Sequence, residues 1–134
     1  MTDMTFEMSY QVPIHDINFG GHLGHVEWLH ILHEARVRFL HQYGQSETNF
    51  YGTALVMRHV DVTYRQQAHW GDHLHIALTV KQEKARLCFD YAVRKAGESS
   101  SALTAKMDMV AIDLERQTIV RPPLITPRGA LTTH

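Results

Sequence analysis

Most of this chain alternates apolar and polar residues with the period of a β-strand, and one helical segment interrupts the pattern. Alternation runs from Thr5 to Val12, stops at Pro13, and returns in four later segments. Before those four segments, apolar residues from about Val26 to Tyr43 recur with helical spacing. One helix combined with five strands predicts an α+β fold, in which the helix packs on one face of an antiparallel sheet.

The four later segments each place a row of apolar residues on one strand face. The rows are Val56, Val60, Val62 and Tyr64; Leu74, Ile76, Leu78 and Val80; Leu87, Phe89, Tyr91 and Val93; and Leu103, Ala105, Met107 and Met109. Short connections favour an antiparallel meander of the last three segments. Arg58 is expected on the face of the first row, either at the margin of the core or beside an acid or a ligand.

The predicted helix is apolar on more than one side, because Ile31 and Val37 add apolar surface outside its main stripe. A helix of this kind needs more than one packing partner. We therefore expect the sheet on one side and a second element, such as another subunit, near the other.

Composition restricts the partners and the location. The 134 residues include 13 basic and 14 acidic side chains, so the net charge of −1 predicts no general attraction to nucleic acid or to an anionic membrane. Cys88 is the only cysteine, which excludes an intramolecular disulfide, and the N-terminus lacks a signal-peptide pattern. We expect a cytoplasmic protein with one domain over residues 1–134, of which residues 115–134 form an extended tail.

The segment from Asp16 to His25 combines ionisable side chains with three glycines, and it leads directly into the predicted helix. Free N–H groups at a helix start can stabilise an oxyanion, or a carbonyl oxygen that is becoming one. This is the requirement of acyl transfer. The alternative is a loop whose polar side chains only cap the helix, because one glycine-rich loop is weak evidence of function.

The chain contains 11 histidines, and some are spaced like metal ligands. His22 and His25 are three residues apart, as are His30 and His33, but the H-E-x-x-H motif does not occur. Such pairs arise easily by chance at this histidine content, so we predict no metal site. Cys88 lies in the middle of a predicted strand and is expected to be a packing residue rather than a nucleophile.

The loop from Asp16 to His25, with the helical residues Leu32-His33-Glu34-Ala35-Arg36, resembles the hotdog-fold acyl-CoA thioesterases of the 4-hydroxybenzoyl-CoA thioesterase-like family. The family pattern is loosely D-x-D-x-x-G-H-V-N-N, followed by a helix that contains E-x-A-R. The resemblance implies a long central helix wrapped by a curved five-stranded antiparallel sheet. It also implies an acyl-CoA substrate, no cofactor other than the coenzyme A of that substrate, and a homodimer or a dimer of dimers with active sites between subunits.

The chain departs from the family pattern at the position that matters most for the reaction. The second Asp of D-x-D is commonly the catalytic carboxylate of the family, and here Asn18 occupies that position. Asp16 retains the first Asp, and Gly21-His22 retains the Gly-His pair. An amide has no proton to take up near neutral pH, so another group would have to act as the base.

Three interpretations remain open. In the first, Asn18 positions water or the carbonyl group, and His22 or Asp16 is the base, with His22 preferred. The oxyanion or substrate-binding residues would then be Gly20, Gly21, Leu23, Gly24 and His25. In the second, Glu34 reaches the site from the helix, although such a carboxylate is more often part of a surface ion pair. In the third, the protein is a non-catalytic homodimer that binds an acyl-CoA or another apolar ligand.

Overall fold

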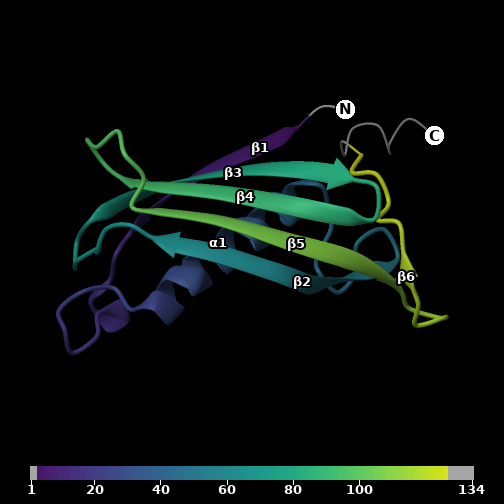
Figure 1. The fold of residues 1–134 in the computed structure, drawn as a ribbon, viewed down its shortest axis with the longest axis horizontal. Coiled ribbons are helices and arrows are strands. Elements are labelled where there is room, and N and C mark those ends of the chain that lie inside the picture. The colour runs from purple at the N-terminus through teal and green to yellow at the C-terminus, as the bar shows by residue number, and fades with distance from the viewer. Residues whose placement is uncertain (1–2, 127–134) are drawn as a thin grey trace.

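The computed structural model describes residues 3–126. Its elements, in chain order, are β1 (Met4–Gln11), the short 3-10 helix η1 (Ile14–Asp16), α1 (His25–Gln42), β2 (Thr53–Tyr64), β3 (His73–Glu83), β4 (Arg86–Lys95), β5 (Leu103–Asp113) and β6 (Ile119–Val120). Figure 1 shows α1 running behind the sheet, across the direction of its strands. The predicted helix and strands are therefore present, with the helix boundaries one residue earlier than expected.

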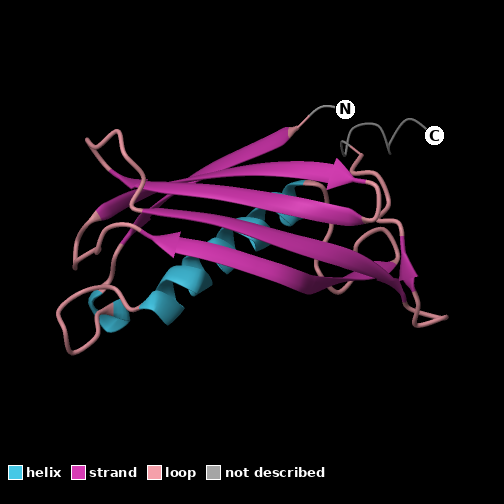
Figure 2. Cartoon of the chain, viewed as in Figure 1, coloured by secondary structure: helices cyan, strands magenta, loops and turns pink. Residues whose placement is uncertain are grey.

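The sheet is antiparallel, with strand order β1-β3-β4-β5-β2, and β3, β4 and β5 form the predicted meander. The short strand β6 pairs with β5, so the sheet has six strands rather than the five expected. The sixth strand lies in the segment predicted to be an extended tail, and residues 127–134 of that tail are outside the described residues. The long helix α1 lies on one face of the sheet, as predicted (Figure 2).

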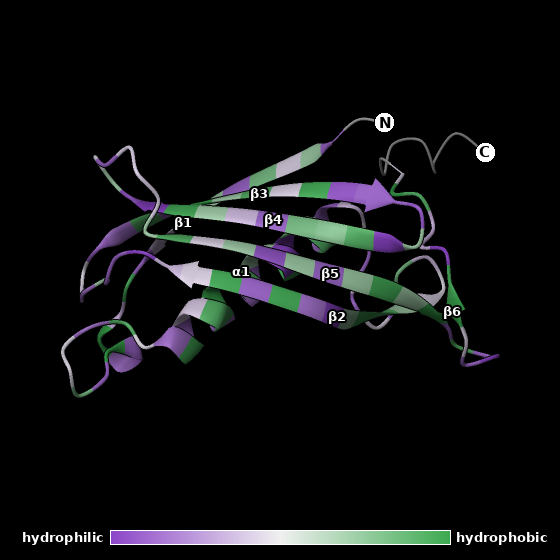
Figure 3. Ribbon diagram, in the orientation of Figure 1, coloured by the Kyte–Doolittle hydropathy of each residue, from purple (hydrophilic) through white to green (hydrophobic). Residues whose placement is uncertain are grey.

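The core lies between α1 and the sheet face that carries the apolar rows. Alternation of hydrophobic and hydrophilic residues is visible along the strands in Figure 3. The helix buries Trp28, Leu32 and Phe39, and the Phe39 ring meets the Phe89 ring of β4 edge to face with centroids 6.2 Å apart. Burial of these side chains is the main source of stability for the layer.

A β-bulge corrects the predicted face of the first apolar row. The register between β2 and β5 shifts between Met57 and His59, so Arg58 is an extra residue in β2. Val56 therefore pairs with Val110 on the outer face of the sheet, opposite to the face of Val60. Arg58 is exposed at the bulge and does not share a face with both valines, because strict alternation fails where two residues oppose one.

Strands β1 and β2 form the two edges of the sheet. The 12-residue β2 pairs with β5 on one side only. Its half-exposed apolar side chains are Val56, Val60 and Tyr64. A long edge strand with exposed apolar side chains is a surface that native proteins usually cover. No helix of residues 3–126 is long and apolar enough to cross a bilayer.

Candidate active site

The loop from Asp16 to His25 connects β1 to α1 and is held by a neighbouring loop. The Leu23 N–H donates a 2.7 Å hydrogen bond to the Ala68 carbonyl oxygen. Val12 accepts a 2.9 Å bond from the Gly71 N–H and donates a 3.0 Å bond to the Asp72 carbonyl oxygen. The loop is thus fixed at Leu23, and the strand end before it is fixed at Val12, although half of the loop residues are exposed.

Asn18 organises the turn inside this loop. Its side-chain oxygen accepts hydrogen bonds from the Gly20 N–H at 2.9 Å and from the His22 N–H at 3.4 Å. Its backbone also accepts from Gly21 and donates to His22, each at 3.0 Å. Gly21 has a φ of +83°, a conformation that favours glycine. The side-chain oxygen of Asn18 therefore accepts hydrogen bonds from the loop itself, while its side-chain nitrogen, Nδ2, remains as a donor.

Gly24 is the buried N-cap residue that precedes α1, and it supplies no side-chain cap. A β-carbon at Gly24 would collide with the Glu27 carboxylate and would lie 3.9 Å from the Asn18 amide nitrogen. Both side chains therefore lie close to the Gly24 backbone, and a larger residue at this position would displace the Glu27 carboxylate. The positive end of the helix dipole faces this point, and the Glu27 carboxylate lies beside it.

Asp16 is the last residue of η1 and is tied to β1. The Tyr10 hydroxyl donates a 2.6 Å hydrogen bond to Asp16 Oδ2, and His15 Nε2 lies 3.4 Å from Asp16 Oδ1. The Asp16 side chain is only 16% exposed, whereas that of His15 is 78% exposed. Burial, together with the hydrogen bond to Asp16, raises the pKa of Tyr10 to about 12. Tyr10 is therefore a protonated donor at any physiological pH.

A hollow of about 390 Å³ lies beside Asp16 at the N-terminal end of α1. The lining residues are His15, Asp16, Ile17, Asn18, Phe19 and Glu27. Asp16 and Asn18, two of the predicted catalytic residues, come together here. Phe19 is fully exposed at the rim of the hollow, where an aromatic ring is available to an apolar ligand.

His22 lies in the same loop but does not line this hollow. Its Nδ1 is 3.3 Å from the Leu23 carbonyl oxygen. On the other side of the ring, a β-carbon at Gly20 would lie 3.1 Å from Nε2, so the ring packs closely against the loop backbone. The His22 backbone thus contacts Asn18, but its imidazole is not among the side chains that line the hollow.

Glu34 is also outside the hollow. It lies in the middle of α1, about half exposed, and accepts a 2.7 Å hydrogen bond from Arg38 Nε, four residues further along the helix. This is a surface ion pair, the predicted alternative to a catalytic role for Glu34.

The Arg36 side chain of the same helical motif is buried. Its Nε donates to Glu47 Oε2 at 2.5 Å, and its Nη1 donates to the Tyr91 hydroxyl at 3.1 Å. His33 Nε2 lies 3.0 Å from Glu47 Oε1. Burial raises the pKa of Glu47, but the hydrogen bond and charge of Arg36, assisted by His33, outweigh burial and leave this pKa lowered. These contacts join α1 to the sheet rather than to the hollow.

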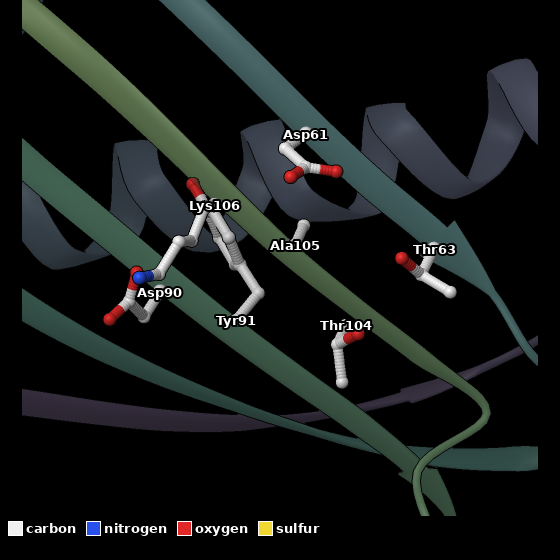
Figure 4. Close-up of a pocket in the computed structure, with 7 residues that line it drawn as sticks. All are labelled: Asp61, Thr63, Asp90, Tyr91, Thr104, Ala105 and Lys106. Carbon is white, nitrogen blue, oxygen red and sulfur yellow. The ribbon is translucent and has the colours of Figure 1, made fainter.

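A second hollow, of about 340 Å³, lies on the outer face of the sheet. Its lining residues are Asp61, Thr63, Asp90, Tyr91, Thr104, Ala105 and Lys106 (Figure 4). The Lys106 side chain points toward Asp90 in this view. The register pairs Lys106 with both Asp61 and Asp90 across the strands, so these charges are distributed over an open polar surface. Within residues 3–126, no group of three metal-ligating side chains occurs at this or any other position.

Sequence reasoning missed two residues of the site, Tyr10 and Glu27. Tyr10 shares the period of the apolar residues of β1, so alternation predicts a core side chain at this position. Glu27 occupies the third position after the Gly24 N-cap, where an acid often contacts the helix start, and this position was the available signal.

Comparisons with known proteins identify the family and the fold of this chain. A profile described as the thioesterase-like superfamily matches residues 12–128. A 1,4-dihydroxy-2-naphthoyl-CoA hydrolase from Synechocystis is 30% identical over 114 residues, which cover 82% of this chain and 83% of that protein. The crystal structure of a 1,4-dihydroxy-2-naphthoyl-CoA thioesterase from Synechocystis has a TM-score of 0.81 at 27% identity and covers 90% of each chain.

A Staphylococcus aureus protein, whose structure was determined in complex with CoA, has a TM-score of 0.80. It is 19% identical, with 92% of this chain and 79% of that chain covered, and this identity shows the shared fold alone. Together the matches confirm the family resemblance and the hotdog fold predicted from the sequence.

Proposed function

Because this chain belongs to the thioesterase-like superfamily, we propose that it hydrolyses the thioester of an acyl-CoA to a carboxylic acid and CoA. The observation that carries the proposal is the shared hollow of Asp16 and Asn18 at the N-terminal end of α1. One residue supplies a proton acceptor and the other an orienting amide, so the hollow contains the groups that activation of water requires.

In the proposed reaction, the Asp16 carboxylate takes a proton from water while the water oxygen attacks the carbonyl carbon of the thioester. The carbon–sulfur bond of the tetrahedral intermediate then breaks, and the CoA thiolate takes up the proton from Asp16. The net change is one thioester and one water converted to one carboxylic acid and one thiol. The Asn18 amide nitrogen, which is not used by the loop, orients the water or the carbonyl oxygen.

The developing oxyanion is assigned to the backbone N–H groups near Gly24. The N-cap supplies no side-chain acceptor, so the first N–H groups of α1 are available. Stabilisation by such donors is usually a large contribution to acyl transfer. The N–H groups of Gly20 and Gly21 already donate to Asn18, and that of Leu23 donates to Ala68, so these three predicted residues shape the loop instead. The oxyanion assignment therefore rests on Gly24 and His25 at the start of the helix.

We assign Asp16 rather than His22 as the base. The Asp16 carboxylate lines the hollow with Asn18, whereas the His22 ring packs on the loop backbone. Replacing the base is expected to lower kcat by about 10²- to 10⁴-fold, the usual contribution of general base catalysis. Asp16→Asn should show this loss and His22→Gln should not. The opposite result would assign the base to His22.

We further propose that the active form is a homodimer, in which β2 of one chain pairs with β2 of a second chain. The free edge of β2 and its exposed apolar side chains support this arrangement. The Tyr64 hydroxyl at the end of β2 donates a 3.1 Å hydrogen bond to the His25 carbonyl oxygen at the start of α1. The edge strand is therefore connected directly to the site, and pairing across it would place the partner chain nearby. A dimer of dimers is a further assembly of the same unit.

The substrate class that we test first is an aromatic acyl-CoA. The support is the Synechocystis relative, a 1,4-dihydroxy-2-naphthoyl-CoA hydrolase, together with the exposed Phe19 ring at the rim of the hollow. We place the activity in the cytoplasm, because a single cysteine suits a reducing compartment.

The experiment is an assay of thiol release from a panel of short, medium, long and aromatic acyl-CoAs. Turnover of an aromatic member, lost in Asp16→Asn, is the expected result. Binding of acyl-CoAs without any thiol release above background would overturn hydrolysis and favour the non-catalytic binder. Asn18→Asp adds a matched arm, since restoring a carboxylate at this position should change the rate only if Asn18 contacts the reacting groups.

A further inference from the structure

We infer that Tyr10 is a positioning residue of the reaction, which acts by holding the Asp16 carboxylate through the 2.6 Å hydrogen bond from its hydroxyl. The inference rests on the proposed function, with Asp16 as the base. Tyr10 does not line the hollow, so it acts through Asp16 and not on the substrate itself.

The two partners differ in how firmly the fold holds them. Tyr10 belongs to β1, whose eight residues all pair with β3, and Tyr10 itself lies opposite Leu74. Asp16 ends a 3-10 helix of three residues that has no buried member. A rigid donor on the sheet thus fixes a carboxylate on a weakly supported turn. Preorganisation of this kind is what a base needs before it can take a proton in the correct direction.

The hydrogen bond uses only one of the two carboxylate oxygens. Tyr10 occupies Oδ2, and Oδ1 faces the imidazole of His15, which is 78% exposed and free to move. Oδ1 is therefore the oxygen left for water. A neutral hydroxyl holds Oδ2, and the ionisable partner of Asp16 among residues 3–126 is the exposed His15 at Oδ1.

The other charged groups near this pair are His15 and two acids of α1. Glu27 lines the same hollow as Asp16, and the charge of Glu34 also acts on Tyr10 in the direction that keeps its hydroxyl protonated. Burial, the Asp16 carboxylate and the charge of Glu34 all raise the pKa of Tyr10, so its hydroxyl stays protonated and can donate. No other side chain among residues 3–126 donates a hydrogen bond to Asp16 Oδ2.

The test compares Tyr10→Phe with Tyr43→Phe in the full-length protein. Tyr43 also packs in the fold, with its ring 5.2 Å from Phe39, but its hydroxyl forms no hydrogen bond within the described part of the chain. Tyr10→Phe is expected to lower kcat about tenfold with KM within about twofold, because the carboxylate loses its fixed orientation while substrate binding is unchanged. Tyr43→Phe should leave both unchanged.

A double-mutant cycle separates positioning from general damage. If Tyr10 acts through Asp16, then Tyr10→Phe should have no further effect on kcat in an Asp16→Asn background. A tenfold loss that persists in this background, or a wild-type kcat in Tyr10→Phe, would overturn the inference and leave thioester hydrolysis standing.

A spectroscopic measurement keeps this result separate from the proposed function. The ¹³C carboxyl resonance of Asp16, assigned with Asp16→Asn, should shift in Tyr10→Phe at neutral pH and not in Tyr43→Phe. If the wild-type protein cleaves no acyl-CoA, the proposed function fails. A shifted resonance would then show that Tyr10 still orients the carboxylate, and an unshifted one would overturn the inference as well.

Discussion

Arg36 Nη1 donates a 3.1 Å hydrogen bond to the Tyr91 hydroxyl, which joins the middle of α1 to β4 inside the core. The same guanidinium contacts Glu47, and the Arg36 side chain is only 8% exposed. A buried charge of this kind is tolerated because each partner is hydrogen-bonded. Arg36 therefore fixes the helix against the sheet, and with it the loop at the start of the helix.

Arg36→Met should lower the free energy of unfolding by about 3 kcal/mol, because it removes one partner of a largely buried pair and leaves Glu47 and Tyr91 without it. The matched control is Arg38→Met, which breaks the exposed Glu34–Arg38 pair and should cost less than about 0.5 kcal/mol. Urea unfolding of both variants measures the difference. Equal losses would show that burial of Arg36 contributes nothing to stability.

Glu47→Gln should make the free energy of unfolding depend less on pH in the acidic range. The pKa of Glu47 is lowered in the folded state, so its ionised form contributes stability above the ordinary carboxylate pKa, and this contribution is lost as pH falls through the folded pKa. The variant should therefore be less stable than wild type at pH 7, by about 2 kcal/mol, and the gap should close below about pH 4. Unfolding midpoints measured across this range test the sign. A gap that widens in acid would contradict it.

Strand periodicity predicted the sheet because each apolar row must face the one helix. The face predicted for Val56 was wrong because the bulge at Arg58 adds one residue to β2. The residues of β2 before the bulge therefore point to the opposite face from the one that alternation predicts. The bulge depends on pairing with β5, so a rule that considers β2 alone cannot locate it. The family motif was more informative than periodicity for the loop, because Asp16 and Asn18 are close in sequence.

Side chains that reach the site from a distance were not predictable in the same way. Alternation gives the face of Tyr10, but the contact with Asp16 depends on how η1 turns back toward β1. The motif favours His22 as the base, but the motif does not contain the direction of its ring, which in the folded loop packs on the backbone outside the lining of the hollow.

Val60→Lys should convert the proposed dimer to a monomer. Val60 is 45% exposed on the edge strand β2, and a lysine there adds like charges across a two-fold interface. The control is Leu124→Lys, at a residue that is 67% exposed and lies beside Gln82 of β3 and Arg86 of β4 rather than on β2. Light scattering coupled to size exclusion measures the mass. A dimeric Val60→Lys protein would show that the chains associate through another surface.

Glu27→Gln should raise kcat. The Glu27 carboxylate lies beside Gly24 at the positive end of α1, where it opposes the negative charge that develops on the thioester oxygen. A charge in the first helical turn interacts with the dipole by about 0.3–1 kcal/mol, so removing it should increase kcat about two- to fivefold. Glutamine keeps the shape, and Glu98→Gln, at an exposed turn after β4, is the control for loss of one negative charge. A fall in kcat by 100-fold or more would instead identify Glu27 as the base, because general base catalysis contributes about 10²- to 10⁴-fold. Steady-state rates at saturating acyl-CoA therefore distinguish a Glu27 charge that opposes the oxyanion from a Glu27 carboxylate that acts as the general base.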